Sequence, residues 1–208
     1  IPVCYIADGH HRAAASARIG AENRKANHGH TGNEEYNWFL AVLFPAAQLQ
    51  ILPYNRVVQD LNGLDCESFL RAVERRFKVQ AGVDSTPASA RKVRMYLDGK
   101  RYGLSWGGGG GTDVVSTLDV SVLQSELLDP ILGIKDPRTD RRIEFVGGIR
   151  GTGELTKLVD SGKAAVAFSM HPVSVEQVMA IADAGMIMPP KSTWFEPKLR
   201  SGLLIHTF

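Results

Sequence analysis

Apolar residues gather in short runs along this chain of 208 residues, and most runs have the length of a single β-strand. Runs with almost no polar residue predict strands covered on both faces, over residues 1–7, 38–44 and 164–170. Shorter runs predict strands over residues 49–52, 56–58, 143–146 and 203–208. Asp98 and Gly99 suit a type I′ turn and predict a hairpin over residues 94–106.

Helical patterns lie between these runs. An Ala-rich stretch from His11 or Arg12 predicts a helix by intrinsic propensity, ending near Gly20 or Ala26. Residues 65–77 place apolar side chains at helical spacing and charges opposite them, which predicts an amphipathic helix. Further helices are expected over residues 120–128, 154–159 and 175–184. Because strands and helices interleave, the expected fold class is mixed α/β, or α+β.

Polar and glycine-rich segments predict loops at residues 27–33 and at the five glycines of residues 107–111. His28 and His30 have a spacing that metal ligands use, but no third ligand is evident beside them. We therefore expect a solvated loop there.

Charge and cysteine content narrow the function. The 24 basic residues nearly balance the 22 acidic ones, for a net charge of +2. Nucleic acid is therefore not an expected partner, whereas a small anionic ligand needs only a local excess of positive charge. Cys4 and Cys66 form no paired motif, and neither a membrane-spanning run nor a signal peptide is visible. We expect a soluble cytoplasmic protein with no membrane partner, and the oligomeric state stays open.

The sharpest chemical signal is Asp8, Gly9, His10, His11 and Arg12, where the first predicted strand meets the first predicted helix. A helix start exposes unpaired N–H groups and the positive end of the helix dipole. Gly9 allows close approach by a ligand, the histidines add donors, and Arg12 offers a planar fork for phosphate oxygens. The Asp8 carboxylate could orient a histidine, hold a magnesium ion or cap the helix. The alternative is structural: Asp8 caps, the histidines are solvated, and Arg12 pairs with an acid.

Two later segments are weaker candidates. Residues 147–153 are rich in glycine but fit neither the P-loop nor the dinucleotide pattern. A tight turn with Thr152 as N-cap is favoured there, with Arg150 as a candidate anion contact. Residues 189–198 form a stiff loop in which Lys191, Ser192 and Thr193 could meet a ligand. The aromatic pair Trp194 and Phe195 could equally anchor that loop to the core.

These segments also carry a family resemblance. ADGHHRAAA at residues 7–15 resembles the signature turn of the ParB/sulfiredoxin-like superfamily. The chain more specifically resembles a bacterial and archaeal family called domain of unknown function 1015. The resemblance rests on that turn and on three further segments, ILPYNRVV, DPRTDRRIEFVGGIRG and IMPPKSTWFEPKLRSGL, which begin at residues 51, 136 and 187. The resemblance covers most of the chain.

The superfamily resemblance implies that Gly9, His10, His11 and Arg12 hold the phosphates of ADP, ATP or CTP. It implies catalytic roles for Asp8, His10 and His11, and a magnesium ion near Asp8. Phosphate transfer to a small hydroxyl compound such as free serine is the implied activity. In free serine kinases a carboxylate from an earlier strand is the expected base, and its counterpart here would precede Ile1.

Residues 1–58 are then expected to be the C-terminal portion of a ParB-like phosphate- or nucleotide-binding domain. Residues 59–208 would form a second mixed α/β domain. Because the chain opens without Met inside an apolar run, we expect it to be the C-terminal part of a longer protein. Two alternatives stay open: a non-catalytic module that binds a nucleotide or phosphorylated metabolite, and a ParB-like DNA-associated protein. The small net charge and the lack of a recognisable helix-turn-helix count against the second.

Overall fold

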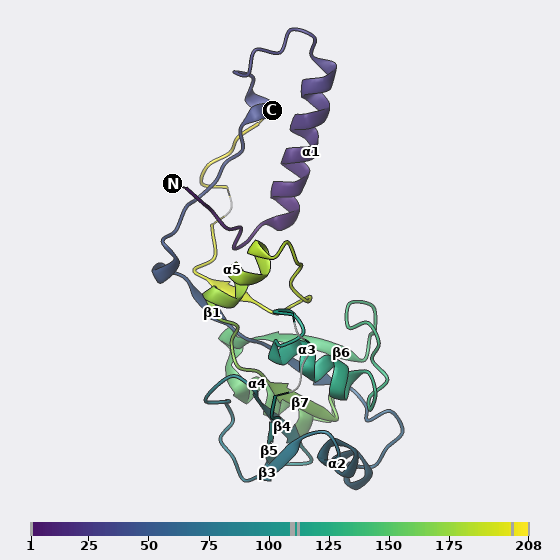
Figure 1. Ribbon diagram of the computed structural model, residues 1–208. Helices are drawn as coiled ribbons and strands as arrows, with labels where there is room; N and C mark the ends of the chain where they lie inside the picture. The colour runs from purple at the N-terminus through teal and green to yellow at the C-terminus, as the bar shows by residue number, and fades with distance from the viewer. Residues whose placement is uncertain (1, 109–110, 112, 201, 208) are drawn as a thin grey trace. The chain divides into compact units, whose positions relative to one another are not determined.

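Two compact units make up the chain in the computed structural model, which describes residues 2–108, 111, 113–200 and 202–207 (Figure 1). The first unit comprises Ile1–Gln50 and Phe195–Phe208, and the second comprises Ile51–Trp194. Helices and strands alternate along the chain, which confirms the mixed α/β class. The division into a ParB-like domain ending at residue 58 and a second domain stays a prediction.

The second unit is built on a six-stranded sheet whose neighbouring strands pair antiparallel. In spatial order the strands are β3 (Lys78–Ala81), β5 (Lys100–Ser105), β4 (Lys92–Leu97), β7 (Val166–Ser169), β2 (Tyr54–Val58) and β6 (Ile143–Gly147). The predicted hairpin is confirmed, with Asp98 and Gly99 at φ 48° and 72° in the turn between β4 and β5. A separate two-stranded sheet pairs β1 (Gln50–Leu52) with β8 (Trp194–Glu196).

Helices cover both faces of the six-stranded sheet. The main core contains Phe69 of α2, Leu123 of α3, Phe168 of β7 and Ile181 of α5. The opposite face packs Ala167 and its neighbours against α4. The bounds are α2 (Cys66–Glu74), α3 (Asp119–Leu123), which continues as the π-helix η3 (Gln124–Leu128), η4 (Gly148–Arg150), α4 (Gly151–Asp160) and α5 (Val175–Asp183). Successive side chains of a strand point to opposite faces of the sheet, so one face packs on the main core and the other on α4.

The first unit consists mainly of helix α1 (His10–Ala26), the predicted loop after it, and the short helices η1 (Glu35–Asn37) and η2 (Ala46–Gln48). Helix α1 has no buried residue, so its alanine content rather than packing favours it. Gly20 lets η1 approach, because a Cβ there would lie 2.7 Å from the carbonyl oxygen of Tyr36. No helix among the described residues is long and apolar enough to cross a membrane.

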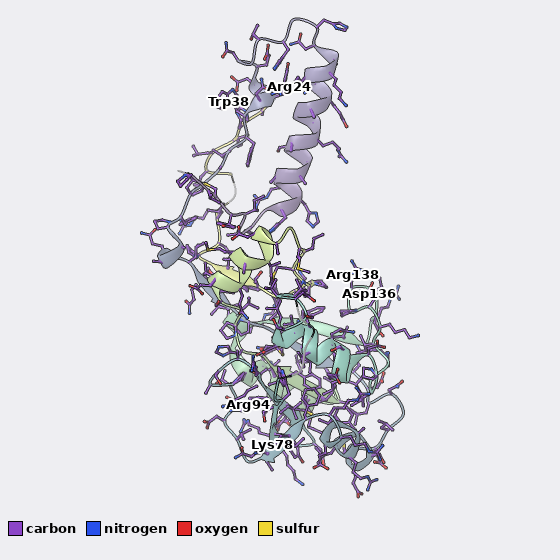
Figure 2. All side chains as sticks on the ribbon, viewed as in Figure 1. Arg24, Trp38, Lys78, Arg94, Asp136 and Arg138 are labelled. Carbon is purple, nitrogen blue, oxygen red and sulfur yellow. The ribbon has the colours of Figure 1, made fainter. Side chains whose placement is uncertain are left out.

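The strands predicted over residues 1–7, 38–44 and 203–208 are wrong for the residues that the structure describes. These segments belong to no sheet, and Val3, Trp38 and Ile205 are 60%, 61% and 80% exposed. Figure 2 labels Trp38. A strand needs a hydrogen-bonded neighbour and a covering layer, and no described residue gives these segments a ladder partner. Residues 1, 109, 110 and 208 of the predicted strands and glycine loop lie outside the described residues.

Candidate functional site

The turn at residues 8–12 begins helix α1 in the first unit. Gly9 is the N-cap residue and has the left-handed backbone conformation that glycine adopts without strain, with φ 81° and ψ 28°. No side chain hydrogen-bonds the first turn as a cap, so the alternative in which Asp8 caps the helix is wrong. The helix therefore presents its amide groups and positive dipole end at this turn, as an anion site requires.

Positive side chains converge on the same turn. The guanidinium of Arg12 folds back over Gly9, since a Cβ at Gly9 would lie 3.1 Å from its Nη2. The Asp8 carboxylate lies 3.9 Å from Nη2 of Arg12 and 3.8 Å from Nζ of Lys198. Asp8 and Arg12 are 48% and 71% exposed, so this attraction is weak and screened by solvent. A phosphate could therefore compete with Asp8 for the guanidinium.

His10 and His11 both stand exposed on the first turn of α1. Their exposure agrees with the structural alternative and equally leaves both imidazoles accessible to a ligand. His30, in the predicted loop, is engaged elsewhere: its Nδ1 lies 2.8 Å from the Tyr36 hydroxyl and 2.9 Å from the Glu34 carboxylate. Across the described parts of the chain, no three His, Cys, Asp or Glu side chains are grouped to hold a metal.

In the second unit, the loop at residues 189–194 is held by Arg56 of β2. The Arg56 guanidinium is buried and donates hydrogen bonds to the carbonyls of Tyr54 and Lys191, with the second at 3.3 Å. The Cζ atom of Arg56 also lies 5.5 Å from the centre of the Phe145 ring. Burial lowers the pKa of Arg56 to about 10, because the charged form loses its hydration.

Lys191, Ser192 and Thr193, the candidate ligand contacts of this loop, have different surroundings. Lys191 is exposed at φ 52°, and its Nζ lies 5.5 Å from the centre of the Tyr54 ring. Ser192 is buried, and its hydroxyl donates a hydrogen bond to the carbonyl of Pro189 at 2.7 Å. Its proton is therefore used within the loop and is not offered to a ligand. Thr193 is half-buried. Lys191 is therefore the most accessible of the three.

Trp194 joins this loop to the glycine-rich turn. Its ring centre lies 5.4 Å from that of Tyr54, and a Cβ at Gly147 would lie 2.5 Å from the indole. The amide of Gly148 donates to the carbonyl of Pro53 at 2.8 Å. The structure thus brings residues 147–148 and 191–194 together, and favours anchoring over ligand stacking for Trp194. Phe195, in the first unit, is likewise buried.

The predicted N-cap role of Thr152 is wrong. Helix α4 begins at Gly151 with Arg150 as N-cap, because the 3₁₀ turn η4 runs directly into it. Thr152 lies inside the helix and donates its hydroxyl hydrogen bond to Ser85 at 3.0 Å. Arg150 is exposed, which keeps it accessible to an anion.

Sequence reasoning missed three residues: Tyr54 and Arg56, which hold the loop, and Lys198, which approaches Asp8. An arginine directly before the apolar pair Val57 and Val58 in the strand β2 was the available signal for Arg56. Nothing local marked Lys198, because its neighbour Asp8 lies at the other end of the chain.

The structure defines a mixed α/β fold in which no side chain caps the start of helix α1. The chain belongs to the family described as protein of unknown function DUF1015, whose model matches residues 1–121. No curated protein sequence matches it significantly.

Similar solved structures include a variant of a free serine kinase in complex with AMP, at 13% identity and a TM-score of 0.50, covering 91% of this chain and 66% of that one. The free serine kinase itself in complex with AMP has 13% identity, the same coverages and a TM-score of 0.49. A conserved hypothetical protein from Pyrococcus furiosus has 14% identity and a TM-score of 0.45, covering 91% of this chain and 68% of that one. The chain thus spans 66% of the length of the kinase chains, and the likeness is one of fold.

Proposed function

We propose that the chain binds the phosphate groups of a nucleotide at the turn of residues 8–12. We propose further that the protein transfers phosphate between ADP or ATP and a small hydroxyl compound such as free serine. The observation that carries the proposal is the start of α1, where no side chain caps the amides and the Arg12 guanidinium lies over Gly9. Amides, dipole and guanidinium together suit the charge and shape of a phosphate. The fold likeness to a free serine kinase variant supports the choice of ligand class.

Each residue of the turn has a role in this proposal. The amides of the first turn and the Arg12 guanidinium hold phosphate oxygens, and His10 and His11 donate further hydrogen bonds. Magnesium in such sites is held by one or two carboxylates together with the substrate phosphates. Asp8 is half exposed and only loosely paired with Lys198, so its carboxylate fits that single-ligand role.

Arg150, Lys191, Ser192 and Thr193 stay proposals as anion contacts of the second unit. Of these, exposed Lys191 and Arg150 are the ones to substitute first.

Calorimetric titration with ADP, ATP and CTP, with and without magnesium, tests the proposal. Arg12→Ala should weaken binding by about ten-fold or more, since charge-assisted hydrogen bonds to phosphate are lost. Arg18→Ala is the matched control, because Arg18 is also an exposed arginine of α1. The proposal fails if no nucleotide binds, or if the two variants bind nucleotide equally well.

A second candidate is a binding module without turnover. Its support is the position of the Asp8 carboxylate between two cations, Arg12 and Lys198, where it acts as a counter-ion that a bound phosphate would replace. Incubation with ATP labelled at the γ-phosphate and free serine separates the two: labelled product indicates transfer, and saturable binding without product indicates the module.

A further inference from the structure

A small cavity lies in the second unit, on the face of the sheet that α4 covers. It has a volume of about 20 Å³, and its lining includes Arg94 of β4, Ser169 of β7 and Thr152 of α4. Arg94 and Ser169 sit directly opposite each other in the antiparallel pairing of β4 with β7. Figure 2 labels Arg94 within the second unit. These polar side chains stand next to the apolar contacts through which α4 packs on this face.

Two buried donors at this cavity lack acceptors. Among the residues that the structure describes, Nε of Arg94 and Oγ of Ser169 find no hydrogen-bond partner. Ser169 is only 3% exposed, so bulk water does not solvate its hydroxyl. Buried polar groups in folded proteins are nearly always paired, and leaving one unpaired destabilises the fold. The cavity therefore calls for a ligand with acceptor oxygens.

The surrounding elements make room for negative charge. Gly103 of β5 leaves space for the guanidinium, because a Cβ there would lie 2.7 Å from Nη1 of Arg94. A second guanidinium, that of Arg101, also lines the cavity and lies 5.7 Å from the centre of the Tyr96 ring. Helix α4 starts beside the cavity without a side-chain cap, so its dipole adds to the positive potential.

We propose that this cavity binds a phosphate group, either as inorganic phosphate or at the end of a phosphomonoester. A volume of about 20 Å³ holds one oxygen atom, which would accept from Arg94 and Ser169. The remaining oxygens would lie at the mouth, beside Arg101 and the hydroxyl of Ser85. Two guanidinium groups and the hydroxyls of Ser85 and Ser169 offer donors from several directions, as a tetrahedral phosphate requires. The proposal does not depend on the turn at residues 8–12.

Nuclear magnetic resonance of the full chain tests the site, with the amide signals of Thr152 and Ser169 followed at constant ionic strength. Titrations use inorganic phosphate, phenyl phosphate and acetate as probes. We expect saturable shifts with a phosphate probe and none with acetate. Tighter binding of phenyl phosphate would identify a phosphomonoester site, and tighter binding of inorganic phosphate a site for the free ion.

Ser169→Ala and Arg94→Met should each weaken phosphate binding by about ten-fold or more. Ser169→Ala should also raise the melting temperature without phosphate, because it removes the unpaired hydroxyl. Lys92→Met is the matched control: Lys92 lies two residues from Arg94 on the same side of β4 but does not line the cavity. Arg12→Ala should leave this titration unchanged, which separates it from the nucleotide site.

The proposal is overturned if neither phosphate probe gives saturable shifts, or if Ser169→Ala and Lys92→Met bind phosphate equally. It is also overturned if a high-resolution crystal structure grown in phosphate shows a buried water only at Arg94 and Ser169.

Discussion

Nη2 of Arg56 donates a hydrogen bond of 3.3 Å to the carbonyl oxygen of Lys191, a residue 135 positions further along the chain. This contact joins strand β2 to the loop at residues 189–194. Lys191 has a left-handed backbone conformation in that loop, at φ 52°. The same guanidinium donates to the carbonyl of Tyr54, whose ring faces the Lys191 ammonium. A single buried cation thus fixes both the backbone and the side-chain surroundings of Lys191.

Arg56→Met should destabilise the second unit by about 2 to 4 kcal/mol, because two carbonyl groups lose their buried donor. Urea unfolding followed by circular dichroism measures the change. Arg71→Met is the control, since Arg71 is an exposed residue of α2 that pairs with Glu67 and Ser68 at the surface, and its loss should cost about 1 kcal/mol or less. Equal effects of the two substitutions would show that Arg56 does not hold the loop.

The fold was predictable wherever local pattern and tertiary surroundings agree. Strand β7 and residues 38–44 are both apolar runs, yet only β7 has hydrogen-bonded neighbours, β2 and β4, on its two sides. Helix α5 was predictable from both ends, because Ser174 and Gln177 form a capping box and Gly185 follows at φ 66°. Which apolar runs are buried depends on distant partners, and no local pattern carries that information.

The candidate sites show the same division. The turn at residues 8–12 could be located from sequence, because glycine, histidines and arginine at a helix start form a local signal. The approach of Lys198 to Asp8 and the pairing of Arg94 with Ser169 depend on tertiary contacts between distant segments. Sequence reasoning therefore found one polar turn and missed the cavity altogether.

Gly9→Ala should destabilise the start of helix α1 by about 1 to 2 kcal/mol, because an L side chain is strained at φ 81°. The new Cβ would also lie 3.1 Å from Nη2 of Arg12 and displace the guanidinium from its position over Gly9. Hydrogen exchange of the α1 amides measures the local effect.

Gly153→Ala in α4 is the control for this substitution. A Cβ there meets nothing within 4 Å, so it should stabilise its helix by about 0.5 to 1 kcal/mol. Slower exchange at α1 in Gly9→Ala would contradict the left-handed cap.

Gly147→Ala should displace the indole of Trp194, because the added Cβ would lie 2.5 Å from the ring. Overpacking of this kind costs about 1 to 3 kcal/mol. The chain has three tryptophans, so fluorescence is read in a Trp38→Phe, Trp106→Phe background that leaves Trp194 alone. We expect a red-shifted emission and a lower unfolding midpoint. Unchanged emission would mean that the indole does not pack on Gly147.

The Glu34 carboxylate should titrate well below an ordinary glutamate. It accepts hydrogen bonds from the backbone amides of Thr31 and Gly32 at 2.7 and 3.0 Å, and from the Thr31 hydroxyl at 3.0 Å. These donors, with the Thr31 amide as the main cause, lower the pKa of Glu34 from 4.5 to about 2.

Because the pKa of Glu34 is depressed in the folded loop, its stabilising effect is full above pH 4.5 and is lost as the pH falls through about 2. The amide proton shift of Thr31, followed by nuclear magnetic resonance, should therefore change with a midpoint near pH 2. Glu34→Gln should abolish that step and speed hydrogen exchange at Thr31 and Gly32 at neutral pH. Glu22→Gln, an exposed residue of α1, should leave the step in place. A wild-type midpoint near 4.5 would mean that the carboxylate does not hold the loop in solution.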